Sequence, residues 1–261
     1  MTEFCRSSAL PHLEARRSCQ EKPCYRPHFH DTFSIGVVNE GASVFAGGLE
    51  GVVRLVAGDV IVIPAGHVHS CNPEQGRWLY QMIHSDQDWA AALAPPDAED
   101  LFDRVSVLRR PGLPDGVGTL NDLLFADASP EILEEGFAAL LAELAHARPT
   151  RVVVPDADPE LDARLRPVLD RLRDDETNPA LDELAGLVGM TTYQLVRAVR
   201  RSTGLSPLAW RQNARIIRAR HLLREGHPIA ETAQALGFAD QSHFHRVFRA
   251  HVAASPGAYR S

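Results

Sequence analysis

One pattern occurs twice in the last hundred residues, and it restricts the fold of that segment more than any other feature of the chain. The first copy is a short amphipathic segment closed by glycine at 181–190, followed by a second amphipathic segment at 193–202. The second copy repeats this order at 229–238 and 241–251. Alanine where the helices cross and glycine at the turn let two short helices pack closely. We therefore predict two helix-turn-helix motifs in an all-α C-terminal domain.

A longer helix is predicted between the two motifs, from about 207 to 224. Ser206 is a good N-cap, and Pro207 suits the first helical position, where its missing N–H costs nothing. Apolar residues of this helix should face the bundle, with its arginines, Arg211, Arg215, Arg218 and Arg220, around them. Such a helix would hold the two motifs at a fixed spacing that matches successive major grooves, about 34 Å apart.

The charge of the chain changes sign along its length. The net charge is −7, but residues 1–160 carry 12 basic and 24 acidic side chains, whereas residues 161–261 carry 15 and 10. All 15 of these cations are arginine. An acidic front half and a basic rear third indicate two domains with different partners, and the basic one favours a polyanion.

Helical spacing predicts that the second helix of each motif buries one face, with Leu195 and Val199 in the first motif and Phe244, Val247 and Phe248 in the second. The opposite face of each helix remains free to contact a partner. In the first motif this face carries Tyr193, Val196, Arg197, Arg200 and Arg201. In the second motif it carries Gln241, Ser242, His243, Arg246 and Arg249. Glutamine, serine and arginine near a helix N-terminus suit base edges, and later arginines suit phosphates. We predict that these residues contact double-stranded DNA; the alternative is a solvated basic face on a helical bundle.

The front half begins with strands. Short runs rich in valine, isoleucine and aromatic residues, separated by glycine turns, occupy 33–38, 43–46, 52–56, 60–63 and 78–83. Strands at this spacing predict a sandwich or a small barrel that is either filled or holds one ligand. After Ser85 we expect helices at 86–93 and 130–147.

The second of these helices carries a continuous apolar stripe. Its members are Ile132, Leu133, Phe137, Leu140, Leu141 and Leu144. The stripe either packs on the barrel or forms a subunit interface. Prolines and aspartates follow it, and we predict a linker there with a domain boundary between 1–155 and 156–261.

Composition excludes some classes of protein. No apolar run is long enough to span a bilayer, and the N-terminus does not match a secretory signal, so we expect a cytoplasmic protein. The four cysteines lack C-x-x-C spacing and are expected to be free thiols in a reducing compartment. A zinc site from Cys19, Cys24, His28 and His30 is conceivable, but the spacing fits no common zinc module.

The last hundred residues closely resemble the DNA-binding domain of the AraC family of bacterial transcriptional regulators. The most specific match is the run GFADQSHF at 237–244, supported by Ser-Pro pairs at 206–207 and 255–256. The resemblance implies that DNA is read through Tyr193, Val196 and Arg197 in the first motif. It implies Gln241, Ser242, His243 and Arg246 in the second. Val196 departs from the family, in which this position is often polar.

The front half resembles the cupin sensor domain found in many members of that family. The run GDVIVIPAGHVH at 58–69 is similar to the second cupin motif, and His28-x-His30 is similar to the start of the first. The resemblance implies that His28, His30 and His69 match the three histidines of the cupin metal site. The family's glutamate has no counterpart at 31–34. Three imidazole ligands are enough to bind a divalent metal ion and leave some of its coordination positions open.

The alternative to a metal is an organic ligand hydrogen-bonded by these histidines, which we favour because the carboxylate is missing. Strand alternation together with the resemblance predicts an effector pocket near His28 and His30. Its predicted lining is Phe33, Ile35, Ile63, His69, Tyr80 and Met82. A small apolar cavity with a few polar groups suits a small organic effector.

These observations favour an α+β protein of two domains: a cupin-like β-barrel with flanking helices, and an all-α domain with two helix-turn-helix motifs. We expect a non-enzymatic, sequence-specific transcriptional regulator controlled by a small-molecule effector. We expect a homodimer that needs no cofactor and contacts RNA polymerase if it activates. One alternative is a metal-dependent cupin enzyme with an accessory DNA-binding module; another is a DNA-binding protein whose barrel serves only dimerisation.

Overall fold

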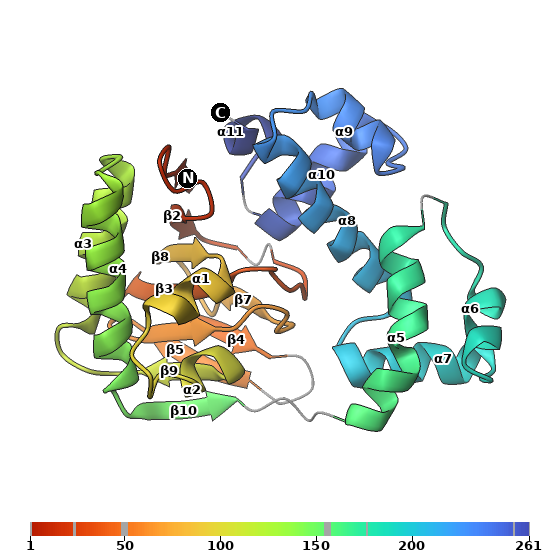
Figure 1. Cartoon of the computed structure of the whole chain (residues 1–261), viewed down its shortest axis with the longest axis horizontal. Coiled ribbons are helices and arrows are strands. Elements are labelled where there is room, and N and C mark those ends of the chain that lie inside the picture. The colour runs from red at the N-terminus through yellow and green to blue at the C-terminus, as the bar shows by residue number, and fades with distance from the viewer. Residues whose placement is uncertain are drawn as a thin grey trace. The chain divides into compact units, whose positions relative to one another are not determined.

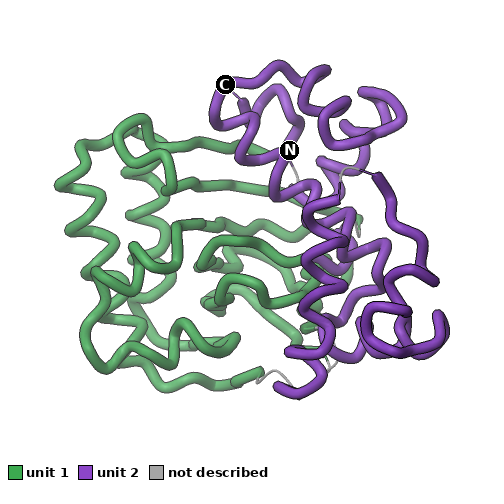
Figure 2. The backbone as a smooth tube through the Cα atoms, turned by 45° about the vertical axis from the view of Figure 1, so that its right-hand side comes forward, with its two compact units in different colours: residues 1–24, 29–154 green, residues 25–28, 155–261 purple. Residues whose placement is uncertain are grey.

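The computed structural model describes residues 2–22, 25–47, 52–153, 158–175, 177–252 and 254–260. The chain divides into two compact units, one of residues 1–24 and 29–154 and the other of residues 25–28 and 155–261 (Figure 2). The first unit is rich in strands and the second is helical. The α+β fold class predicted from the sequence is confirmed.

The strands of the N-terminal unit form two antiparallel sheets. The larger sheet consists of β1 (Thr2–Arg6), β2 (Glu14–Gln20), β8 (Trp78–Ser85), β3 (Phe33–Glu40), β6 (Val60–Ile63), β9 (Val105–Leu108) and β10 (Pro149–Val153), in that spatial order. The smaller sheet consists of β5 (Val52–Val56), β4 (Ala42–Ala46) and β7 (Ser70–Pro73).

Helices of the same unit are α1 (Gln87–Leu93), α2 (Asp100–Asp103), α3 (Leu113–Phe125) and α4 (Pro130–Ala145). The two longer ones, α3 and α4, lie over one face of the larger sheet (Figure 1). On that face Phe33, Ile35 and Val37 of β3 join the apolar residues of both helices in one cluster. Successive side chains of a strand alternate, so Ser34 and Gly36 point to the other face. That face is the interior between the two sheets, because β3 also contacts β5 of the smaller sheet.

All five strands predicted from the sequence are present as β3, β4, β5, β6 and β8, and the two predicted helices as α1 and α4. The expectation that only helices follow Ser85 is wrong, because β9 and β10 extend the larger sheet. The expected linker overlaps β10, which begins at Pro149. Proline is tolerated at the first residue of an edge strand, where no ladder partner needs its N–H. Residues 154–157 of that expected linker lie outside the described residues, and its last two, Asp158 and Pro159, begin a helix of the other unit.

The apolar stripe of α4 packs inside the N-terminal unit. Leu133, Phe137 and Leu141 belong to the core cluster, and so do Leu140 and Leu144, which are only 3% and 0% exposed. Ile132 is the exception, with 48% of its surface exposed. The alternative that this stripe forms a subunit interface is therefore wrong: its side chains already pack against the helix-covered face of the larger sheet.

The C-terminal unit contains the two predicted motifs. Its helices are α5 (Pro159–Asp174), α6 (Leu181–Leu187), α7 (Thr192–Thr203), α8 (Pro207–Arg224), α9 (Ile229–Ala235), α10 (Gln241–Val252) and α11 (Pro256–Arg260). The pairs α6–α7 and α9–α10 are the two helix-turn-helix motifs. Gly189 and Gly237 occupy their turns with φ of +61° and +67°, a left-handed conformation that glycine adopts without strain. The helix α5, which the sequence did not predict, packs against the first motif through Leu165, Val168 and Leu172.

Two arginines of α8 are buried, contrary to the expectation that the arginines lie around the apolar face. Arg211 is 1% exposed and donates hydrogen bonds to the carbonyl oxygens of Leu172, Asp175 and Thr177. Arg220 donates to the hydroxyl of Tyr259 in α11. Because helix C-terminal carbonyls have no partner within the helix, a buried guanidinium can satisfy them. Helical periodicity alone does not reveal such acceptors.

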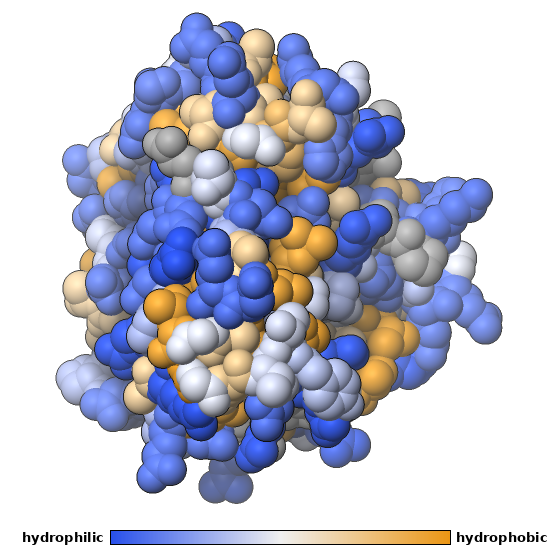
Figure 3. Space-filling model, turned by 90° about the vertical axis from the view of Figure 1, so that its right-hand side faces the viewer, coloured by the Kyte–Doolittle hydropathy of each residue, from blue (hydrophilic) through white to orange (hydrophobic). Residues whose placement is uncertain are grey.

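Figure 3 shows one face of the molecule, on which hydrophilic residues predominate and hydrophobic ones occur in small groups among them. Among the described residues, no helix is both long and apolar enough to cross a membrane.

Candidate DNA-binding helices and effector site

The first recognition helix, α7, is fixed at its start by a capping box. The hydroxyl of Thr191 accepts from the backbone N–H of Gln194, and the Gln194 side chain accepts from the backbone N–H of Thr191. Leu195 and Val199 are buried against α5 and α6, as predicted. The opposite face of the helix is therefore free to meet a partner.

Four of the five residues predicted to read DNA from α7 are exposed: Tyr193, Arg197, Arg200 and Arg201. Tyr193 is 70% exposed, and its hydroxyl accepts a hydrogen bond of 3.1 Å from Arg197. The Arg197 guanidinium also lies over the Tyr193 ring, which orients it along the outer face. Val196 is half-buried, and Arg201 pairs with Asp158 at 3.3 Å. Tyr193 and Arg197 thus form an exposed, mutually contacting pair on this helix.

The second recognition helix, α10, presents a matching polar face. Asp240 accepts from the backbone N–H of His243 at 2.6 Å and so caps the start of the helix. Phe244 and Phe248 are buried, as predicted, and anchor the helix to its unit, whereas Val247, also predicted to be buried, is half-buried. The exposed residues are Gln241, Ser242, Arg246 and Arg249. His243 is half-buried beside the ring of Phe238.

We expect Arg246→Ala to weaken binding to a specific DNA site by about 1–3 kcal/mol and binding to random DNA much less, because a bidentate contact to guanine distinguishes bases. The affinities are compared by titration with an operator selected from random sequences and with a scrambled duplex. Arg249→Ala, later on the same helix, is the matched control and should weaken both complexes alike through a lost phosphate contact. Equal losses for Arg246→Ala on the two duplexes would make it a phosphate contact only.

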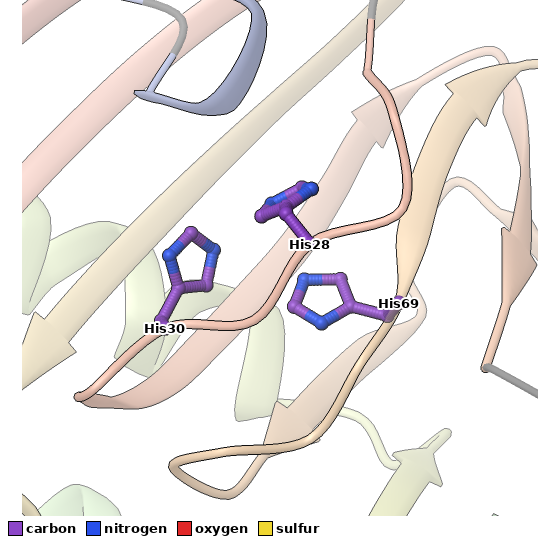
Figure 4. Close-up of side chains that lie close together, drawn as sticks. All are labelled: His28, His30 and His69. Atoms are coloured by element: carbon purple, nitrogen blue, oxygen red, sulfur yellow. The ribbon is translucent and has the colours of Figure 1, made fainter. Parts of the chain in front are cut away.

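Three histidines of the N-terminal sequence converge in space. His28 and His30 lie in the segment before β3, and His69 directly precedes β7; their rings gather in one place (Figure 4). Each offers one nitrogen, and these nitrogens all lie within 4.8 Å of one another. His28 and His69 are buried, and His30 is half-buried. The sequence prediction that these three residues share a site is consistent with this geometry.

Backbone carbonyls fix the orientation of two of these imidazoles. The Nδ1 atom of His69 lies 2.9 Å from the carbonyl oxygen of His67, and Nδ1 of His28 lies 2.6 Å from that of Arg26. A carbonyl only accepts, so Nδ1 carries the proton and Nε2 presents its lone pair. Burial lowers the pKa of His69 to about 4, so its ring is neutral near pH 7. A neutral imidazole oriented in this way can accept from an organic ligand or bind a metal ion.

A fourth histidine adjoins this group, and the sequence analysis missed it. The ring centroid of His84 in β8 lies 5.2 Å from that of His30, and its Nδ1 lies 2.8 Å from the hydroxyl oxygen of Ser34. Both residues sit on the interior face of the larger sheet, opposite each other in the β3–β8 register. Alternation along the predicted strand at 78–83 could have pointed to His84, had the strand been extended by one residue.

Two of the predicted pocket residues lie on the wrong face. Phe33 and Ile35 belong to the cluster covered by helices, so they do not line the interior between the sheets. Ile63, Tyr80 and Met82 do face that interior, because they lie opposite Ser34, Val38 and Gly36 in the register. The side chains on both faces of β3 are apolar or small, so the sequence did not distinguish the two faces. An error of one residue in the assumed alternation assigns every side chain to the wrong face.

The conceivable zinc site cannot be assigned as a group, because Cys24 lies outside the described residues. Cys5, Cys19 and Cys71 are free thiols. Burial raises the pKa of Cys71 to about 11, so this thiol is protonated and unreactive near pH 7.

Both units match known family models. Residues 10–187 match the AraC-like ligand binding domain, and residues 184–261 match a helix-turn-helix domain. The arabinose operon regulatory protein of Salmonella typhimurium is 28% identical over 235 residues, which cover 87% of this chain and 80% of that protein. The corresponding protein of Escherichia coli is 27% identical over 217 residues, covering 78% and 72%.

The fold is also similar to solved structures. ToxT from Vibrio cholerae superposes with a TM-score of 0.53 at 13% identity, covering 95% of this chain and 98% of that one. The chain thus matches along both of its units, and it belongs to the AraC family, as a DNA-binding transcription regulator with an N-terminal ligand-binding domain.

Proposed function

We propose that an organic effector bound between the two sheets of the N-terminal unit controls how the two recognition helices bind DNA. The observation that carries this proposal is the group of buried polar side chains in that interior: neutral His69, and His84 hydrogen-bonded to Ser34. Buried polar groups are costly unless they are paired, and convergent ones in an apolar surround are typical of ligand sites. An effector shifts the populations of two states only if it binds one of them better.

A structural relative supports the choice of an organic effector. ToxT from Vibrio cholerae has been solved with an unsaturated fatty acid bound, at 14% identity and a TM-score of 0.54 to this chain. The similarity extends over 95% of the chain. By analogy, the N-terminal unit of this protein is proposed to be its sensor.

A divalent metal ion is the second candidate for the same histidines. His28, His30 and His69 fit one by distance and by the orientation of their Nε2 atoms, and a bound ion would supply Lewis acidity there. Among the described residues, however, no carboxylate joins this cluster. We therefore rank a metal-dependent enzyme below an effector-controlled regulator. Near-stoichiometric metal in purified protein, together with turnover, would reverse that ranking.

We expect His69→Ala to abolish the response of the full chain to its effector without changing DNA binding in the absence of effector, because His69 contacts the ligand and not the DNA. The test screens small metabolites for those that change operator binding by wild type, then repeats the titration with the variant. His146→Ala, at the exposed histidine that follows the last residue of α4, is the control. A full response from the His69→Ala protein would contradict the proposed site.

Further parts of the proposal concern assembly. We propose residues 1–155 as the sensor and dimerisation domain and 156–261 as the DNA-binding domain of a cytoplasmic homodimer that needs no cofactor and has no enzymatic activity. Two tethered DNA-binding domains raise each other's effective concentration at a paired site. If the protein activates transcription, RNA polymerase is its further partner. The mass of the full chain in solution tests the dimer.

A further inference from the structure

The end of the first recognition helix, α7, is joined to the start of α5, which lies beside it in the same unit (Figure 1). Arg201 donates to the carboxylate of Asp158, with 3.3 Å between Nη2 and Oδ2. One residue further along α7, the hydroxyl of Ser202 donates to the carboxylate of Asp162. The helix dipole favours acidic groups at the start of a helix and basic groups at its end, so opposite charges meet at this junction.

Asp158 is held in place by its own helix. Its Oδ1 atom accepts from the backbone N–H of Leu161 at 3.1 Å, which makes Asp158 the N-cap of α5. The other carboxylate oxygen, Oδ2, accepts from Arg201. The side chain of Asp158 is 38% exposed and that of Arg201 is 68% exposed. The carboxylate is therefore the fixed partner of this ion pair, and the longer, more exposed arginine is the partner that can turn away.

The ion pair distinguishes Arg201 from the other arginines on the exposed face of α7. Arg197 donates to the hydroxyl of Tyr193, and neither it nor Arg200 forms an ion pair with another of the described residues. Phosphate and carboxylate oxygens accept from the same guanidinium N–H groups. The Nη2 group of Arg201 must therefore leave Asp158 before it can donate to a phosphate of DNA, and the carboxylate repels that phosphate as well.

We propose that Asp158 is a positioning residue that limits the affinity of the protein for DNA, because it competes with a backbone phosphate for Arg201. An exposed ion pair contributes little to stability, so a phosphate can displace the carboxylate at a small cost in free energy. The effect should extend to DNA of any sequence, since phosphate contacts carry no sequence information. The proposal rests on the predicted contact between Arg201 and DNA, and it is independent of the effector and its site.

The experiment measures binding of the full chain to a random-sequence DNA duplex at a series of salt concentrations. Asp158→Asn keeps an oxygen that can cap α5, but its NH2 group cannot accept from Arg201. We expect this variant to bind about two- to fivefold more tightly at low salt, the range that corresponds to an exposed ion pair. The slope of log K against log salt concentration should steepen by up to about 0.9, which corresponds to one additional phosphate contact.

Two controls separate the ion pair from a general effect of charge. Glu160→Gln removes one negative charge from the exposed first turn of the same helix and should change the affinity much less. Arg201→Ala should itself weaken binding to DNA. In the Arg201→Ala protein the further change Asp158→Asn should have no effect, because the partner of the carboxylate is already missing.

The proposal is overturned if Asp158→Asn leaves both affinity and slope unchanged, or if it tightens binding equally when Arg201 is alanine. Weaker binding by a normally folded Asp158→Asn protein would show that the pair orients Arg201 toward DNA, which is the opposite of the proposal. An Arg201→Ala protein that binds DNA as tightly as wild type would overturn it too. If Asp158→Asn lowers the melting temperature, Asp158→Ser provides the same comparison, because serine also caps helices.

Discussion

Replacing Leu144 with glutamate should unfold the N-terminal unit rather than dissociate an oligomer. Leu144 is fully buried in the cluster that joins α4 to the larger sheet. Burying a carboxyl group there and losing the packing of a leucine should together lower the free energy of unfolding by about 4 kcal/mol or more. That is a large part of the stability of an ordinary domain. Chemical denaturation followed by circular dichroism measures the loss.

The matched control lies on the same helix. Ile132→Glu introduces the same carboxyl group at a position that is 48% exposed. The free energy of unfolding should fall there by no more than about 0.5 kcal/mol. A Leu144→Glu protein that keeps its stability but has a lower mass in solution would restore this stripe as a subunit interface.

Replacing Arg211 with methionine should destabilise the C-terminal unit by about 3–5 kcal/mol. The guanidinium donates to three carbonyl oxygens at 2.6–3.0 Å. Leu172 lies in the last turn of α5, and Asp175 and Thr177 follow that helix. Methionine has no N–H group and can donate to none of the three. Each buried acceptor left without a donor costs about 1–3 kcal/mol. Urea titration of the full chain should show an earlier transition of the helical unit, and DNA binding should weaken in parallel.

Arg218→Met is the control for this substitution, because Arg218 is an exposed arginine on the same helix. It removes the same charge from α8 without leaving acceptors unpaired. If the two variants lose equal stability, the effect is one of net charge, and the hydrogen bonds of Arg211 do not hold α5 to α8.

Local signals in the sequence predicted the recognition helices well. In α7 and α10 the buried residues Leu195, Val199, Phe244 and Phe248 recur at helical spacing, which fixes the face that remains exposed. The strands β3 to β6 and β8 were predicted for a similar reason: each is a short run of β-branched and aromatic residues between glycine turns. The strand β2 was missed because its sequence, EARRSCQ, reads as polar.

The candidate effector site was predicted only in part. The three histidines could be grouped by resemblance, and Ile63, Tyr80 and Met82 were placed on the correct face. His84, whose ring lies beside that of His30, was missed because the strand predicted at 78–83 ended one residue before it. Phe33 and Ile35 were assigned to the interior between the sheets, which Ser34 and Gly36 in fact face, because burial on both faces of β3 leaves no polar side that marks the difference.

The sequence by itself determined the two motifs, the family, the change of charge along the chain and most of the helix and strand positions, because each depends on residues close together in the chain. Only the tertiary structure decided which face of β3 meets the helices, that the stripe of α4 is core, and that Arg16 and Arg211 are buried. Those properties depend on which distant segments pack together: the pairing of β2 with β8 takes Arg16 into the interior, and the end of α5 supplies the acceptors for Arg211. Local periodicity shows that a face is apolar, but the partner of that face is chosen by the fold as a whole.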